Sequence, residues 1–168
     1  MLAIKVEKAK KVEKVEARHE WEAAAEQWHA RHESRETERA LAAPVTRILI
    51  VDNEPRIVDI LVNLLTDDPR GFRLEMAMDG EDALLKVEAF DPSLLILDVV
   101  MRGLHGIEVC RRLKRNPERR TIKILGLTGY PHFVPALRKA GADACLTKPF
   151  DLWQVRQAVD RLIAYAGR

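Results

Sequence analysis

The sequence predicts an α/β fold with a doubly wound, five-stranded parallel sheet, preceded by one long amino-terminal α-helix. Composition changes at Pro44, strand-like apolar runs alternate with helix-like segments after it, and four of these runs end in polar residues. Strands that alternate with helices pair in parallel through right-handed crossovers, which places helices on both faces of the sheet. We therefore expect a charged helical extension over residues 1–43 and a globular domain over residues 44–168.

The extension is highly charged and lacks helix breakers. It contains no Gly, Pro or Asp, and it carries nine Lys or Arg side chains against nine Glu. This composition predicts a helix of about 60 Å if it is continuous. Trp21, Ala24, Ala25 and Trp28 share one face, which a second helix could cover in a coiled-coil homodimer or in a complex with another protein. Because charged residues interrupt the heptad, a solvated and partly frayed helix is the alternative.

After Pro44 the chain alternates between two kinds of segment. Continuous apolar runs such as 48–51 are typical of strands buried on both faces. Segments such as 55–65 repeat apolar residues at helical spacing, and Pro55 suits the first turn of a helix. The expected strands are 47–51, 72–78, 93–97, 122–127 and 144–147, and the expected helices are 55–65, 81–90, 107–115, 133–140 and 152–164.

Composition narrows the class of protein. Hydrophobic residues make up 47% and charged residues 32%, as in soluble globular proteins, and the net charge of +2 does not favour a nucleic-acid or membrane partner. Basic and acidic residues are interleaved in the extension, which also argues against a DNA-binding arm. We find no apolar run of membrane-spanning length and no secretory signal at the start. Two cysteines, Cys110 and Cys145, predict a reducing, cytoplasmic location.

Polar side chains follow four of the expected strands. The carboxyl ends of parallel strands meet at one edge of the sheet, where doubly wound folds bind ligands. Carboxylates there can hold Mg²⁺, and one of them can attack a phosphoryl group as a nucleophile. A hydroxyl and an ammonium would stabilise the oxygens of the transferred group. The residues concerned are Asp52, Asn53, Glu54, Asp98, Thr128, Lys148 and Pro149.

Each of these residues has an ordinary structural role when it is taken alone. An Asp after a strand usually caps the next helix, a Thr there is usually a turn residue, and most lysines lie on the surface. Their coincidence at matching strand ends favours a phosphoryl-transfer site instead. Pro149 after Lys148 predicts a fixed turn in which a cis peptide bond is available.

These motifs resemble the receiver domain of bacterial two-component response regulators. The resemblance covers residues 47 to about 165 and includes Ile-Leu-Ile-Val-Asp-Asn-Glu-Pro at 48–55 and Leu-Ile-Leu-Asp-Val-Val-Met at 95–101. It also includes Leu-Thr-Gly at 127–129 and Gly-Ala-Asp-Ala-Cys-Leu-Thr-Lys-Pro-Phe at 141–150. It implies a flavodoxin-like receiver fold, Mg²⁺ as cofactor, and a histidine kinase or phosphotransfer protein as the phosphoryl donor in a phosphorelay.

The resemblance also implies a role for each matching residue. Asp98 matches the phosphoacceptor, Asp52 an acidic residue of the metal site, and Val100 the residue whose backbone carbonyl binds Mg²⁺. Thr128 matches the switch hydroxyl and Lys148 the family's lysine. Gly106 matches the glycine in the loop after the acceptor. The amino-terminal 46 residues have no counterpart in the family pattern.

Several positions depart from the family pattern. Asn53 stands where the family usually has the carboxylate that contacts the metal, and an amide oxygen binds a cation without charge. Glu54 is next along the chain, and we expect it to compensate only if the loop shifts. Arg102 replaces a proline, and Cys145 replaces the aromatic residue that often couples to the threonine. Tyr130 places a bulky ring near the acceptor.

Three functions are compatible with part or all of this pattern. We expect a phosphoacceptor domain, not an enzyme, that signals by protein–protein contact near segments 133–140 and 144–147 or through the extension, since we expect no effector domain after residue 168. The alternative is a pseudo-receiver, a constitutive interaction or dimerisation module with a degraded metal site at Asn53. A haloacid-dehalogenase-like phosphohydrolase would need a second aspartate two positions after Asp98, where Val100 stands.

Overall fold

The structure is a computed structural model that describes residues 45–166. The helix expected over 1–43, with Trp21, Ala24, Ala25 and Trp28, lies outside the described residues. Five parallel strands form one sheet in the order β2-β1-β3-β4-β5. The strands are β1 (Arg47–Val51), β2 (Arg73–Ala77), β3 (Leu94–Asp98), β4 (Lys123–Thr128) and β5 (Ala144–Thr147). The doubly wound parallel sheet expected from the sequence is confirmed.

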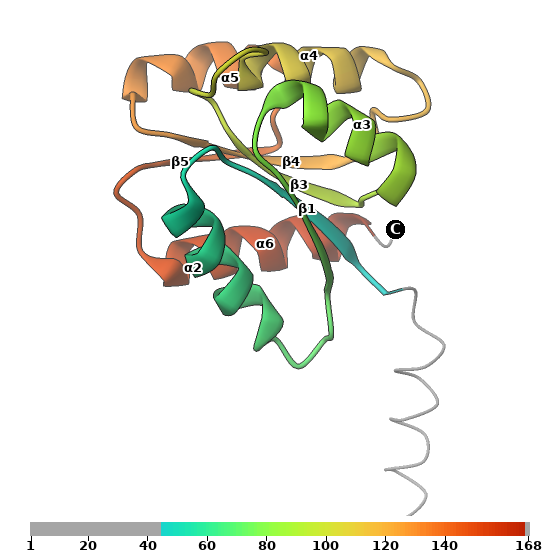
Figure 1. Cartoon of the computed structure of the whole chain (residues 1–168), viewed down its shortest axis with the longest axis vertical. Helices are drawn as coiled ribbons and strands as arrows, with labels where there is room; N and C mark the ends of the chain where they lie inside the picture. The colour runs from blue at the N-terminus through green and yellow to red at the C-terminus, as the bar shows by residue number, and fades with distance from the viewer. Residues whose placement is uncertain (1–44, 167–168) are drawn as a thin grey trace, which may run out of the picture. The chain divides into compact units, whose positions relative to one another are not determined.

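Helices cover both faces of this sheet (Figure 1). They are α2 (Pro55–Thr66), α3 (Gly80–Phe90), α4 (Gly106–Arg115), α5 (Val134–Ala140) and α6 (Leu152–Ala166), with a 3₁₀ turn, η1 (Pro131–Phe133), before α5. On one face, α3, α4 and α5 enclose an apolar cluster that contains Leu95 and Leu97 of β3. On the other face, α2 and α6 pack over Leu94 and Ile96 of the same strand. Successive side chains of β3 thus point alternately into the two apolar clusters, one on each face of the sheet.

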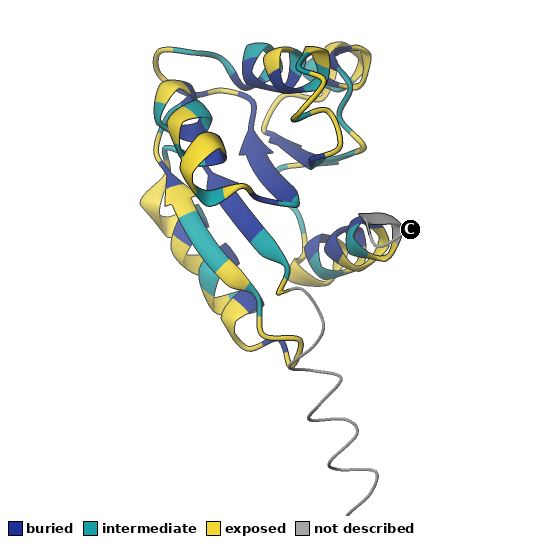
Figure 2. Ribbon diagram, turned by 90° about the vertical axis from the view of Figure 1, so that its right-hand side faces the viewer, coloured by how far each residue is buried: buried dark blue, intermediate teal, exposed yellow. Residues whose placement is uncertain are grey.

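The pattern of burial explains why the strands read as continuous apolar runs. Every residue of β3 is buried, and so is every residue of β1 except Arg47, whereas the edge strand β2 is mostly exposed or half-buried. Figure 2 shows the central strands in dark blue and the outward faces of the helices in yellow. Strands covered on both sides have no polar face, so they appear in the sequence as continuous apolar runs. Such a run locates a strand but does not mark its ends. Within residues 45–166, no helix combines the length and apolar composition that a membrane crossing requires.

Element ends differ from the sequence-based expectation by one or two residues at several points. The third strand runs one residue further than expected, so Asp98 is its last residue rather than the residue after it. The helix expected over 133–140 begins one residue later, at Val134, and η1 directly precedes it. Gly141, in the left-handed conformation with φ of 110°, ends α5.

Candidate functional site

Four strands bring polar residues to one edge of the sheet. Asp52 directly follows β1, Asp98 and Thr128 are the last residues of β3 and β4, and Lys148 follows β5. The parallel register pairs Val51 with Leu97 and Asp98 with Leu127, so these strands end at nearly the same level. Asp52 and Thr128 are fully buried and Asp98 is 3% exposed. The structure thus brings together the acidic residues and the lysine that the sequence singled out.

Lys148 joins the acidic residues. Its Nζ atom lies 2.8 Å from Asp52 Oδ2, 3.0 Å from Asp98 Oδ1 and 3.2 Å from Glu54 Oε1. The peptide bond between Lys148 and Pro149 is cis. The second oxygen of Asp52 accepts a hydrogen bond of 2.9 Å from the backbone N–H of Glu54. One ammonium therefore serves three carboxylates, two of which are buried.

This crowding shifts the ionisation of two groups. Burial raises the pKa of Asp98 above its ordinary value, and the charge of Asp52 adds to the effect, while Lys148 and the Val100 N–H only partly offset it. Burial alone would lower the pKa of Lys148, but its hydrogen bonds to Asp52 and Asp98 outweigh that effect and raise it. Lys148 therefore remains protonated and positively charged. Ionisation of Asp98, in contrast, costs free energy.

The backbone around Asp98 is fixed by hydrogen bonds and by a close approach. Val100 donates its N–H to Asp98 Oδ2 at 3.1 Å, and Gly106 donates to the carbonyl of Val99 at 3.0 Å. A Cβ atom at position 106 would lie 2.1 Å from the Asp98 carbonyl oxygen. Only glycine fits there, because a contact that short forces the backbone apart. This packing gives a physical reason for the glycine that the resemblance singled out.

Thr128 is turned toward the following loop. Its Oγ1 donates to the Tyr130 carbonyl oxygen at 3.3 Å and accepts from the Tyr130 N–H at 3.1 Å. The Tyr130 ring, which is 52% exposed, stands edge-on to Phe133 at 6.0 Å, and His105 of the loop before α4 stands edge-on to Phe133 at 5.4 Å. A ring cluster thus connects the loop after β4 with the loop after β3.

The other positions that the sequence singled out are exposed or half-buried. Arg102 is exposed, Asn53 is half-buried beside Asp52, and the Val100 side chain is exposed. Cys145 packs against the core under α5, and burial raises the pKa of its thiol although Arg138 opposes the shift. Both Cys110 and Cys145 are free thiols.

One contact at the site was not foreseen from the sequence. Glu54 reaches Lys148 directly from its place between β1 and α2. The signal that could have found it is a carboxylate two residues after Asp52, in the turn that leads into α2. Spacing along the chain does not show which way such a side chain turns, so only the structure reveals the contact.

The donor set at this edge fits a hard divalent cation. Mg²⁺ prefers oxygen ligands and usually takes one or two carboxylates while it keeps several waters. Asp52 and Asp98 offer two carboxylates, Asn53 an amide oxygen and Val100 a backbone carbonyl, all at or just beyond the ends of β1 and β3. In the part of the chain that the structure describes, no three Asp, Glu, His or Cys side chains are gathered closely enough to hold a metal between them. The site thus fits Mg²⁺ with few protein ligands.

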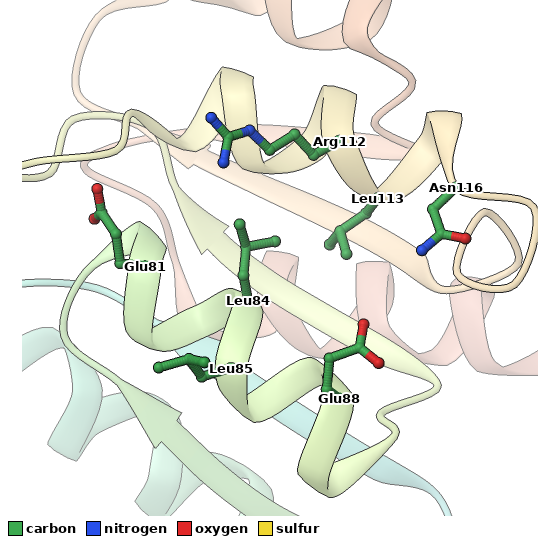
Figure 3. A pocket seen from close by; sticks show the side chains of 7 residues that line it. All are labelled: Glu81, Leu84, Leu85, Glu88, Arg112, Leu113 and Asn116. Carbon is green, nitrogen blue, oxygen red and sulfur yellow. The ribbon is translucent and has the colours of Figure 1, made fainter.

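A hollow lies between α3 and α4 (Figure 3). Its walls are apolar in the middle and charged at the rims. Glu81 at one end of the hollow also accepts a 3.0 Å hydrogen bond from the Leu104 N–H, in the loop that follows β3. The lining residues are Glu81, Leu84, Leu85, Glu88, Arg112, Leu113 and Asn116.

The fold and the site define a class of doubly wound α/β proteins with an acidic, lysine-paired site beyond the carboxyl ends of their strands. Within that class, the model of the response regulator receiver domain family matches residues 48–160. The chain therefore belongs to the response regulator receiver domain family. Members of this family are signalling domains of two-component systems, so the resemblance noted from the motifs is confirmed.

Named relatives support this assignment. The chain is 36% identical over 106 residues to the transcriptional regulatory protein TcrA of Mycobacterium tuberculosis, a match that covers 63% of this chain and 41% of TcrA. It is 38% identical over 119 residues to the alkaline phosphatase synthesis transcriptional regulatory protein PhoP of Bacillus subtilis, which covers 70% of this chain and 48% of PhoP. The chain thus spans about half the length of the curated relatives it matches.

Solved structures show the same fold. A response regulator from Chloroflexus aurantiacus has a TM-score of 0.67 and 31% identity, over 72% of this chain and 99% of that one. The response regulator TrrA of Thermotoga maritima, solved in complex with Mg²⁺-BeF, has a TM-score of 0.63 and 33% identity, over 70% of this chain and 99% of that one. Receiver domains in general bind Mg²⁺, in agreement with the oxygen donors found beside Asp98.

Proposed function

We propose that the chain accepts a phosphoryl group on Asp98 from a histidine kinase or a phosphotransfer protein, in a two-component phosphorelay in the cytoplasm. One observation carries the proposal. Asp98 is a buried carboxylate at the end of a central strand, 3.0 Å from the Lys148 ammonium, with one oxygen facing Lys148 and the other held by the Val100 N–H. A buried acid that is aligned and charge-paired in this way is prepared to act as a nucleophile.

The residues divide the chemistry between them. An Asp98 oxygen attacks phosphorus, the bond from phosphorus to the donor's imidazole nitrogen breaks, and that nitrogen takes up a proton. The product is an acyl phosphate on Asp98. Lys148 stays within reach of the new phosphoryl oxygens because Asp52 holds its ammonium at 2.8 Å. Mg²⁺, when bound, neutralises the negative charge that gathers on the phosphoryl oxygens.

Thr128 provides the link to the output surface. To bind a phosphoryl oxygen on Asp98, its hydroxyl must leave the Tyr130 backbone, to which it is hydrogen-bonded at 3.1 and 3.3 Å. Release of that backbone changes the loop after β4 and the rings of Tyr130 and Phe133 next to α5. Cys145 is too small to swing as an aromatic side chain would, so we propose that the Tyr130 loop carries the signal to α5 and β5. Output is then contact with another protein.

We also propose a role for the extension, which lies outside the described residues. A helix with Trp21 and Trp28 on one face would make the protein a homodimer or dock it on a partner helix, since burial of two indole rings is favourable. Light scattering should show a larger species for the full chain than for a chain that starts at Ala43. A monomer in both cases would exclude self-association and leave docking to another protein.

Labelling of the full chain tests the function. Incubation with acetyl phosphate and Mg²⁺ should increase the intact mass by one phosphoryl group, and Asp98→Asn should abolish the increase. Asp59→Asn, which removes an exposed aspartate on α2, is the matched control and should be labelled like the parent. An unlabelled parent would favour a constitutive interaction module, and a labelled Asp98→Asn variant would disprove the assignment of the acceptor.

A further inference from the structure

We propose that Glu54 supplies the negative charge that the cation site lacks because position 53 is an asparagine. The inference rests on the proposed function, since it concerns the same site, but it assigns a role to a residue that the resemblance leaves without one. Glu54 is the residue before α2, and its carboxylate is 61% exposed. It reaches the same ammonium as the two buried aspartates.

The backbone holds Glu54 in place for this role. Its N–H donates to Asp52 Oδ1 at 2.9 Å, and its carbonyl accepts from Ile57 at 2.9 Å and from Val58 at 3.2 Å. The start of the side chain is therefore fixed beside the site. Its carboxylate, in contrast, is exposed and contacts only the flexible end of Lys148 among the hydrogen bonds of the described residues. It can turn toward a bound cation without disturbing the core.

Charge balance points to the same conclusion. Asp52, Asp98 and Lys148 together leave a net charge of −1, which is less than a divalent cation requires. Glu54 makes the net charge −2, which Mg²⁺ neutralises. Asn53 contributes no charge although it stands next to Asp52. The affinity of oxygen sites for divalent cations increases with the number of charged ligands, so the carboxylate at position 54 strengthens binding.

Glu54 acts from outside the direct ligand set. No three acidic side chains of the described residues are gathered as ready metal ligands, and the Glu54 carboxylate is linked to those of Asp52 and Asp98 through Lys148. Because Mg²⁺ keeps several waters, a nearby carboxylate can accept hydrogen bonds from those waters. Removal of such outer partners typically weakens metal binding by roughly 10–100-fold.

A purely structural role for Glu54 would be to position Lys148. That role and the proposed one differ in a rescue experiment. A carboxylate moved from position 54 to position 53 restores the total charge near the cation but gives up the contact of Glu54 with Lys148. Because Asn53→Asp adds charge by itself, the discriminating quantity is the loss of Mg²⁺ affinity that Glu54→Gln causes in each background. A charge role predicts a smaller loss in the Asn53→Asp background than in the parent, whereas a positioning role predicts equal losses.

The test is calorimetric titration of Mg²⁺ into the metal-free full chain, which needs no phosphoryl donor. Glu54→Gln should bind Mg²⁺ roughly tenfold more weakly than the parent. The double variant Asn53→Asp with Glu54→Gln should lose less affinity than that relative to Asn53→Asp alone. Glu118→Gln is the matched control, because it removes one exposed carboxylate from the loop between α4 and β4 at the opposite edge of the sheet. It should bind like the parent.

Two results would overturn the inference. One is equal affinity of Glu54→Gln and the parent, and the other is a loss of affinity on Glu54→Gln that is as large in the Asn53→Asp background as in the parent. Neither result bears on whether Asp98 accepts a phosphoryl group, which the mass of the labelled parent decides. Conversely, a parent that binds Mg²⁺ through Glu54 but is never labelled would refute the proposed function and leave this inference standing.

Discussion

Two buried aspartates of this chain are held in opposite ways. Asp68, in the loop between α2 and β2, is 5% exposed, and Asp98, at the end of β3, is 3% exposed. The pKa of Asp68 is lowered, chiefly by its hydrogen bond with Arg70, whereas burial raises the pKa of Asp98. Similar exposure thus has opposite electrostatic consequences, because the hydrogen bond with Arg70 dominates at Asp68 whereas burial dominates at Asp98.

Asp68 is fully satisfied by its surroundings. Arg70 donates to it from Nε at 2.7 Å, from a terminal nitrogen at 2.6 Å and from its backbone N–H at 3.0 Å. Arg156 of α6 adds a contact of 3.2 Å and also donates to the carbonyl of Leu64. A bidentate arginine and further donors favour the ionised carboxylate strongly. This cluster ties the end of α2 to α6 and has a structural role.

Asp98 is left short of positive charge. Its one cation among the described residues, Lys148, also serves Asp52 and Glu54. Such an arrangement costs stability, and it persists where a ligand or a reaction makes use of it. Asp98 thus differs from Asp68 because its shared cation, Lys148, does not offset the effect of burial on its pKa. The excess negative charge suits the binding of a divalent cation, which is the role that we propose for this site.

Substitution of Asp68 should cause the largest change in stability. Asp68→Asn should lower the free energy of unfolding by about 2 kcal/mol, because it leaves two arginines without their buried partner. Urea unfolding of the metal-free protein measures the change. Asp160→Asn, which removes only an exposed contact of Arg70, is the control and should change stability by less than about 0.5 kcal/mol. Equal effects of the two substitutions would contradict a structural role for Asp68.

Asp98, which shares the Lys148 cation with two other carboxylates, should respond to substitution with the opposite change in stability. Asp98→Asn should raise the free energy of unfolding of the metal-free protein at pH 7 by on the order of 1 kcal/mol, because a neutral side chain avoids the cost of ionisation beside Asp52. The same urea measurement applies. A loss of stability in this variant would mean that the ion pair with Lys148 outweighs the crowding.

The two aspartates should also differ in how their effects depend on pH. Since the folded pKa of Asp98 is raised, its ionisation cost is complete above that pKa and disappears as pH falls toward the unfolded value of about 3.9. The gain from Asp98→Asn should therefore shrink on acidification from pH 7. Since the folded pKa of Asp68 is lowered, its contribution is present above about pH 3.9 and is lost only as pH falls further. Unfolding measured across this pH range should separate the two variants.

Position 53 should change stability least. Asn53→Asp adds a carboxylate beside Asp52, so it should tighten Mg²⁺ binding and slightly lower the stability of the metal-free protein, by less than about 1 kcal/mol. Titration of Mg²⁺ against protein fluorescence measures the first effect and urea unfolding the second. Equal affinity of the variant and the parent would exclude a direct role for position 53.

The sequence was sufficient to predict the parallel sheet and the residues at its carboxyl edge. Apolar runs covered on both faces and polar residues directly after them are local patterns, so Asp52, Asp98 and Lys148 could be placed together from the sequence alone. The Asp68 cluster could not be found this way, because Arg156 lies 88 residues away along the chain. The contact of Thr128 with the Tyr130 backbone was equally hidden, since it depends on a side-chain rotation.

The underpaired Asp98 is the residue that we propose carries the phosphoryl group. The most direct measurement is reduction of the labelled full chain with borohydride, which converts an aspartyl phosphate to homoserine, followed by peptide mass spectrometry. We expect homoserine at position 98 and an unchanged aspartate at position 52 and at position 68. Homoserine at either of those positions, or at none in a protein whose intact mass shows labelling, would contradict the assignment.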